Sequence, residues 1–77
     1  MTESEWLNIF GNNLLEMMRE YGYTQDTLAR ETGLSKSTIS KYINKQQMPR
    51  SSALINIANV FGCNIDDLVY YGDKIDI

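Results

Sequence analysis

The order of apolar and polar residues along the chain predicts a series of short helices. Thr2 or Ser4 can cap the first helix, and Glu5 lies three residues after Thr2 in the capping-box pattern. The helix runs to about residue 21, where Gly22 ends it. Gly11 lies inside it and costs about 1 kcal/mol relative to alanine, so either the helix frays before residue 11 or a neighbour packs closely there. The expected inner stripe of this helix is Phe10, Leu14, Met17 and Tyr21. Trp6, Ile9 and Met18 flank this stripe.

Residues 24–43 predict two further helices joined by a tight turn, and the rest of the chain is organised around them. Thr24 is a suitable N-cap for the first of the two, which buries Leu28 and Ala29. Gly33 then supplies the left-handed residue that ends this helix.

The second helix of this pair has one apolar face and one polar face. Ser35 caps it, and Ile39 and Ile43 lie one turn apart on the inner side. The opposite side carries polar and cationic residues at i, i+4 and i+7, namely Ser37, Lys41 and Asn44. A stripe that faces the core therefore backs an exposed stripe.

Two more helices complete the expected bundle. Pro49 makes residues 45–50 a loop, and the next helix begins near Ser51 and ends at Gly62. Its inner face repeats at i, i+3, i+4 and i+7: Leu54, Ile57, Ala58 and Phe61. Asn64 is the expected cap of the last helix, and Asp66 and Asp67 suit its positive N-terminal end. Leu68 is expected to face inward, and Gly72 to end the helix.

Length and composition limit what the chain can do. With 77 residues, 43% of them hydrophobic and 22% charged, one small soluble domain is expected. Cys63 is the single cysteine and histidine is absent, so an internal disulfide, a typical zinc site and the usual nucleophile–base pairs are excluded. We therefore expect no metal, no cofactor, no membrane span and no enzymatic activity, and Cys63 is interpreted as a small buried hydrophobe in a reducing cytoplasm.

The distribution of charge matters more than its total. A net charge of −3 and a pI of about 4.7 disfavour nonspecific binding to polyanions. Residues 25–50, however, hold five cations against two acids, a local charge of +3. A basic face on an acidic body is compatible with DNA binding.

The order of several residue types also resembles a known family. These residues are Thr24-Gln25, Leu28-Ala29, Gly33-Leu34-Ser35, Thr38-Ile39-Ser40, Asn44, Pro49, Leu54, Ile57-Ala58 and Phe61-Gly62. They resemble the Cro/CI-type (XRE-like) helix-turn-helix repressors over residues 11–68. The resemblance implies an all-α, five-helix, lambda-repressor-like DNA-binding domain whose second central helix enters the major groove, usually as a dimer on operator DNA.

Two residues depart from the family pattern after the second central helix. The family commonly has a glutamate before Asn44 and a glycine after it, where this chain has Ile43 and Lys45. We expect Ile43 to add to the core and Lys45 to add a phosphate contact. The shape of the turn at this point stays open.

The candidate contact residues follow from the residue types and from the resemblance. Lysine can donate to guanine, and serine can serve any base, so the predicted base contacts are Lys36, Ser37 and Lys41, with Thr38 and Ser40 beside them. The predicted phosphate contacts are Gln25, at the start of the first central helix, and then Asn44, Lys45, Gln47 and Arg50. The alternative is a solvated polar surface without a ligand.

The end of the chain is rich in apolar residues. We expect residues 1–77 to be one domain, with a core at 11–68 and a short tail at 69–77. The residues assigned to a dimer interface are Tyr70, Tyr71, Ile75 and Ile77. The alternative is that these side chains fold back and complete the core.

These observations predict a sequence-specific regulator of transcription, expected to be a repressor that acts as a homodimer. We expect a bacterial or phage-encoded protein that works in the cytoplasm, on nucleoid DNA. No small-molecule ligand is evident, and regulation would come from concentration, dimerisation or a protein partner that masks the DNA face. Two alternatives stay open: the antitoxin of a toxin–antitoxin pair, and a protein-interaction module on the same fold.

Overall fold

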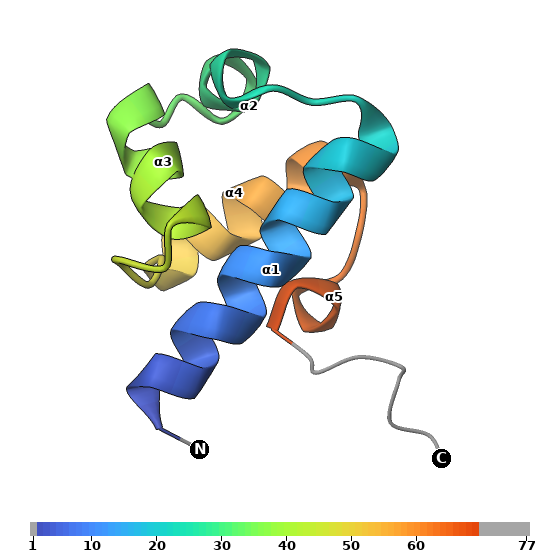
Figure 1. Cartoon of the computed structure of the whole chain (residues 1–77). Coiled ribbons are helices and arrows are strands. Elements are labelled where there is room, and N and C mark those ends of the chain that lie inside the picture. Colours follow the sequence, from blue (N-terminus) through green and yellow to red (C-terminus); the bar gives the residue numbers. More distant parts are fainter. Residues whose placement is uncertain (1, 70–77) are drawn as a thin grey trace.

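The computed structural model describes residues 2–69, which form five helices (Figure 1). These are α1 (Glu3–Tyr21), α2 (Gln25–Thr32), α3 (Lys36–Ile43), α4 (Ser51–Phe61) and α5 (Ile65–Val69). The prediction of an all-α bundle with a central helix-turn-helix is confirmed. Among the residues described, no helix is both long and apolar enough to cross a membrane.

Local hydrogen bonds begin and end the helices largely as predicted. The Thr2 backbone N–H donates to Glu5 Oε1 at 2.8 Å and the Glu5 N–H donates to Thr2 Oγ1 at 3.2 Å, which completes the capping box of α1. Thr24 and Ser35 cap α2 and α3 through their hydroxyls. The left-handed residues that end α1, α2 and α4 are Gly22, Gly33 and Gly62.

Asn64 precedes α5, as predicted, but the bond formed there is the reverse of a side-chain cap. Its backbone N–H donates to Asp67 Oδ2 at 3.1 Å. The predicted helix end at Gly72 lies outside the described residues.

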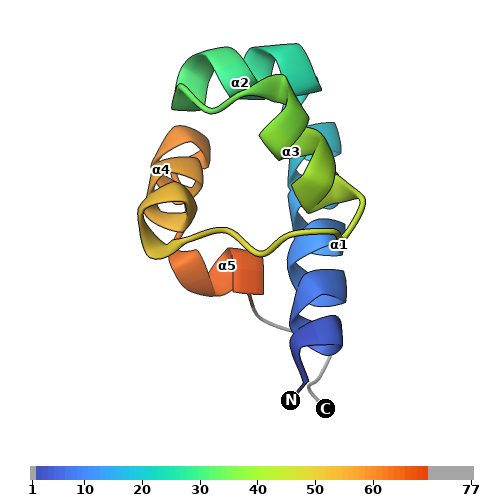
Figure 2. The same cartoon turned by 90° about the vertical axis from the view of Figure 1, so that its left-hand side faces the viewer.

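The helices pack around α1 and α4. Helix α1 contacts α3 and α5, α2 contacts α3 and α4, and α4 contacts α5. A second view shows α2 lying across one end of the bundle, while the N-terminal turns of α1 extend beyond the other end (Figure 2). The helix-turn-helix pair therefore lies at one side of a scaffold made by the remaining helices.

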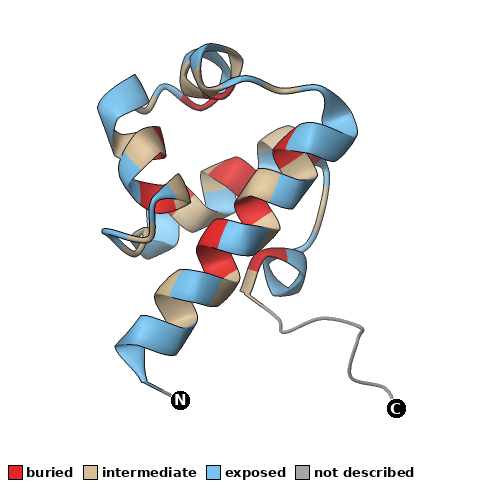
Figure 3. Cartoon of the chain, in the orientation of Figure 1, coloured by how far each residue is buried: buried red, intermediate tan, exposed pale blue. Residues whose placement is uncertain are grey.

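The core lies where the inner faces of the helices meet (Figure 3). Leu28, Ile57 and Leu68 are fully buried, as predicted, and Leu54 is half-buried. The buried cluster is Phe10, Leu14, Met18, Leu28, Ile39, Tyr42, Ile57, Ala58, Phe61 and Leu68.

The predicted inner stripe of α1 was wrong in its C-terminal half. Met18, expected beside the stripe, is only 3% exposed, whereas Met17 is half-buried and Tyr21 is 52% exposed. Phe10, Leu14 and Met18 follow steps of four residues, and each such step turns about 40° around the helix. The buried face therefore winds around α1, which contacts both α3 and α5.

The burial of four further residues refines the pattern, although Ala29 and Ile43 still pack against the core cluster. Ala29 and Ile43 are half-buried, and Tyr42, which the pattern did not assign to the core, is 3% exposed. Trp6 is also half-buried and lies outside the core cluster. The apolar face of α3 is therefore centred between Ile39 and Tyr42.

Cys63 is half-buried and not the fully buried side chain expected. Its thiol donates to Met17 Sδ across a distance of 3.8 Å. Burial raises the pKa of the Cys63 thiol, and the nearby carboxylate of Asp67 raises it further. The thiol is thus held in its neutral form.

The structure decides the question that Gly11 left open. Helix α1 does not fray before residue 11, and Gly11 is buried. A Cβ at this position would lie 2.9 Å from the Tyr42 carbonyl oxygen and 2.9 Å from Lys45 Cγ. The end of α3 therefore rests on the part of α1 that has no side chain.

We expect Gly11→Ala to destabilise the protein by up to about 2 kcal/mol, because an overpacking cost of about 1–3 kcal/mol opposes a gain in helix propensity of about 1 kcal/mol. Urea unfolding followed by circular dichroism measures this. Asn12→Ala, at an exposed neighbour in α1, is the control and should be neutral or slightly stabilising. A Gly11→Ala protein more stable than wild type would contradict the proposed close packing.

Candidate nucleic-acid interface

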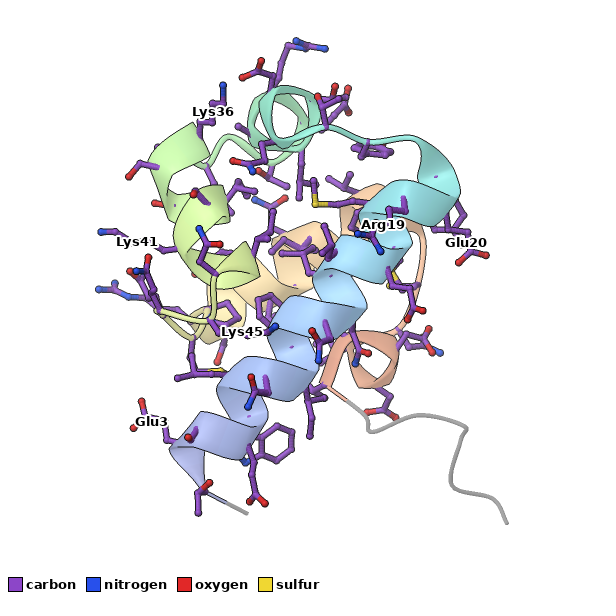
Figure 4. All side chains as sticks on the ribbon, viewed as in Figure 1. Glu3, Arg19, Glu20, Lys36, Lys41 and Lys45 are labelled. Carbon is purple, nitrogen blue, oxygen red and sulfur yellow. The ribbon has the colours of Figure 1, made fainter. Side chains whose placement is uncertain are left out.

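Helix α3 presents a polar face that its apolar face holds in place. Ile39 and Tyr42 are buried, and the ring of Tyr42 meets that of Phe10 edge-on at 5.5 Å. Lys36, Ser37 and Lys41 are exposed. Figure 4 shows Lys36 and Lys41 pointing away from the bundle. These three predicted base-contact residues are exposed and free of the core.

The other two predicted base-contact residues are less open. Thr38 and Ser40 are half-buried, and their hydroxyls have partners within the chain. Ser35 Oγ donates to Thr38 Oγ1 at 2.9 Å, and Asn44 Nδ2 donates to Ser40 Oγ at 3.3 Å. Thr38 and Ser40 thus flank the exposed face.

Lys36 forms an ion pair with Asp26 of α2. Its Nζ lies 3.0 Å from Asp26 Oδ1, and both side chains are well exposed, at 62% and 68%. The pair joins the first turns of the two central helices. An exposed pair of this kind contributes little to stability and can exchange partners readily.

The turn after α3 keeps the form that a glycine would give. Lys45 has φ 62°, the left-handed region, and is the non-glycine residue with positive φ among those described. Its N–H donates to the Tyr42 carbonyl at 3.1 Å, and the Gln46 N–H donates to the Lys41 carbonyl at 2.8 Å. These two bonds form a Schellman motif, which closes the end of α3.

The side chain of Lys45 lies over α1 and not beside Lys41 (Figure 4). Its Cγ covers the place that a Cβ of Gly11 would occupy. The stem of Lys45 is half-buried as a result, so this cation is displaced from the other two lysines of the helix-turn-helix.

The remaining predicted phosphate contacts border α3 on two sides. Gln25 is the half-buried first residue of α2, while Asn44, Gln47 and Arg50 are exposed in or beside the loop after α3. Burial raises the pKa of Tyr42, and the positive charge of Arg50 partly offsets this. Arg50 thus acts electrostatically on the end of α3.

The polar residues that hold the turn between α2 and α3 escaped the sequence analysis. Thr32 is buried; its hydroxyl donates to the Leu28 carbonyl at 2.7 Å and accepts the Leu34 N–H at 3.2 Å. Asn56 of α4 donates from Nδ2 to the Thr32 carbonyl at 2.6 Å. Helix α4 is therefore bonded directly to the turn that sets the direction of α3.

A signal for Asn56 was present in the sequence. An amide within the apolar run 53–58 of a helix needs a hydrogen-bond partner when it is covered. Asn13 behaves similarly in α1, where its Nδ2 donates to the Leu68 carbonyl at 2.9 Å and ties α1 to α5. The acceptors that these two amides bind, in contrast, could not be deduced from the sequence pattern.

The residues assigned to a dimer interface, Tyr70, Tyr71, Ile75 and Ile77, lie outside the described residues. Within residues 2–69, no group of three or more potential metal ligands comes together. The features assembled by the described part of the chain are thus the exposed face of α3 and its polar borders.

Comparison with known proteins decides the family. The helix-turn-helix family model HTH_3 matches residues 14–68. The chain belongs to the HTH_3 helix-turn-helix family. This membership confirms the resemblance to Cro/CI-type proteins, and it makes the chain a DNA-binding regulator and not an enzyme.

Individual relatives of this HTH_3 protein agree with the family. The chain is 29% identical over 72 residues to the uncharacterized HTH-type transcriptional regulator YvzC of Bacillus subtilis (strain 168). That alignment covers 94% of this chain and 92% of the Bacillus protein. The chain is also similar to a solution structure of the SOS-response transcriptional repressor LexA from Eubacterium rectale. That match has a TM-score of 0.86, 26% identity, and covers 100% of this chain and 81% of the other.

We expect Asn56→Asp to destabilise the HTH_3 domain by about 2–3 kcal/mol at neutral pH, because a carboxylate would face the Thr32 carbonyl without a proton to donate. The deficit should shrink near pH 4, where the new carboxyl binds a proton. Urea unfolding at both pH values measures it. Asn59→Asp, exposed on the same helix, is the matched control; equal losses in the two variants would contradict the role given to Asn56.

Proposed function

We propose that this protein is a transcriptional repressor that binds operator DNA as a homodimer, with α3 in the major groove. The observation that carries the proposal is the exposed face of α3 formed by Lys36, Ser37 and Lys41. The buried Ile39 and Tyr42 on the opposite side fix its direction. A helix presented in this way fits the width of the major groove.

Base recognition is assigned to the exposed face. Lys36 and Lys41 can each donate to O6 and N7 of guanine, and Ser37 can bond to either type of base edge. Thr38 and Ser40 take flanking positions, because their hydroxyls are already bonded within the chain. The expected operator half-site therefore contains guanines.

Phosphate contacts are assigned to the borders of α3. Gln25 at the start of α2 combines a side-chain amide with free backbone N–H groups of a helix N-terminus. On the other side, Asn44, Gln47 and Arg50 are exposed. Lys45 is also assigned to the DNA phosphates, from its position over α1. About six neutralised phosphates per dimer give a log–log salt slope of about −5.

The contact surface of the homodimer is assigned to the C-terminal part of the domain. Ile55 of α4 and Ile65 of α5 are large apolar residues that are 48% and 38% exposed. Both line a hollow between α4 and α5, together with Cys63. The tail with Tyr70, Tyr71, Ile75 and Ile77 follows α5 directly and would extend the contact.

Repression follows from occlusion in this proposal. A dimer on an operator that overlaps a promoter excludes RNA polymerase, and the name of the LexA relative supports this sign of regulation. Residues 1–77 act as a single domain, and the protein works in the cytoplasm, where its DNA is.

We expect Lys41→Glu to weaken binding to the duplex upstream of the protein's own gene by about tenfold to a hundredfold, because a base contact is lost. Fluorescence anisotropy at several salt concentrations measures it. Arg19→Glu makes the same charge change on an exposed residue of α1, away from α3 (Figure 4), and should have little effect.

Two results would contradict the proposal. One is wild-type binding no tighter to the upstream duplex than to a scrambled one at any salt concentration. The other is an equal loss in Lys41→Glu and Arg19→Glu, which would assign the effect to total charge and not to the face of α3.

Ile65→Glu should shift the protein toward the monomer, since it places a charge in the proposed contact while an exposed site tolerates the change within about 0.5 kcal/mol of stability. Sedimentation equilibrium measures the mass against the 8.8 kDa of one chain. Asn12→Glu, exposed on α1, is the control. A wild-type protein that stays monomeric on its operator would refute the dimer.

A further inference from the structure

The placement of Lys36 needs an explanation that the fold alone does not give. Lys36 is the first residue of α3, and a cation at a helix N-terminus is unfavourable because the helix dipole is positive there. The Lys36 ammonium is instead stabilised from outside α3, by Asp26 Oδ1 at 3.0 Å. The first turn of α3 thus depends on α2 for its charge balance.

Asp26 is equally unusual for a DNA-binding surface. It directly follows Gln25, for which a phosphate contact is proposed, and its side chain is 68% exposed. A carboxylate within about 8 Å of DNA phosphates repels them with little screening at physiological salt. An acid at this place weakens binding to every duplex, unless its effect depends on the DNA sequence.

We propose that Asp26 is a positioning residue for Lys36 and thereby determines specificity; this inference rests on the function proposed above. Asp26 competes with the DNA phosphates for the Lys36 ammonium, which lowers affinity for DNA of any sequence. It leaves Lys36 able to bind where a guanine edge meets α3.

The donor geometry of lysine allows both contacts at once. An ammonium has three N–H donors, and Asp26 takes one of them at 3.0 Å. The remaining two can reach O6 and N7 of a guanine in the major groove. On DNA without a guanine at this place the ion pair persists but Lys36 gains no base contact, so nothing offsets the repulsion between the Asp26 carboxylate and the phosphates.

The test compares wild type and Asp26→Asn on the upstream duplex and on a scrambled duplex of the same composition. The substitution keeps the size of the side chain and releases Lys36. We expect affinity for the scrambled duplex to rise about fivefold, and affinity for the upstream duplex to rise less, so the ratio between them falls. The salt slope on the scrambled duplex should steepen by about one per protomer.

A second background separates positioning from simple charge. In Lys36→Gln protein, Asp26→Asn should no longer change the ratio between the two duplexes, because no ammonium remains to be released. Glu20→Gln removes one negative charge at an exposed site far from Lys36 (Figure 4). That control should change both affinities by the same small factor.

The inference is overturned if Asp26→Asn leaves the ratio unchanged, or changes it equally in the Lys36→Gln background. A loss of upstream affinity in both backgrounds also overturns it, since Asp26 would then bind a base itself. If wild type binds neither duplex, the proposed function fails and the inference falls with it. A third outcome separates the two proposals: wild type binds the upstream duplex more tightly than the scrambled one, Lys41→Glu does not, and Asp26→Asn leaves the ratio of the two affinities unchanged. In that case only the inference fails.

Discussion

The close contact between Gly11 of α1 and the carbonyl of Tyr42 fixes the end of α3 that lies nearest the core. A single Cβ at Gly11 would come within 2.9 Å of that oxygen, so the helix can approach α1 only because the carbon is missing. The edge-on contact of Phe10 with Tyr42 and the stem of Lys45 then close the space around it. With its inner side held in this way, α3 has one face left for solvent, and that face carries Lys36, Ser37 and Lys41.

The other end of α3 is fixed by hydrogen bonds as well as by the packing of Leu34 and Ile39. Thr32 holds the turn from within through Leu28 and Leu34, and Asn56 binds the same turn from α4. Both ends of α3 are therefore tied to the scaffold before any DNA arrives. A preformed surface loses little conformational freedom on binding, which leaves more of the contact energy for affinity.

Two lysines occupy locally unfavourable positions, one because of its backbone conformation and one because of its charge. Lys45 adopts a left-handed conformation that costs about 1–2 kcal/mol for a residue with a side chain, and the two hydrogen bonds of its Schellman motif and its position over α1 offset this. Lys36 lies at a positive helix end and is balanced by Asp26. One exception occurs in the helix-turn-helix and the other directly after it, and each adds a cation to an otherwise acidic protein.

The sequence by itself determined the helices, most of their ends and the polar face of α3, because caps, glycines and apolar periodicity act over a few residues. It also determined the exposed positions of Ser37 and Lys41, since these follow from the same periodicity. Only the tertiary structure decided that Met18 and Tyr42 are buried while Tyr21 is exposed, and that Lys45 lies over Gly11. It alone paired Lys36 with Asp26 and Asn56 with Thr32. These outcomes depend on the angles and distances between helices, which no local pattern contains.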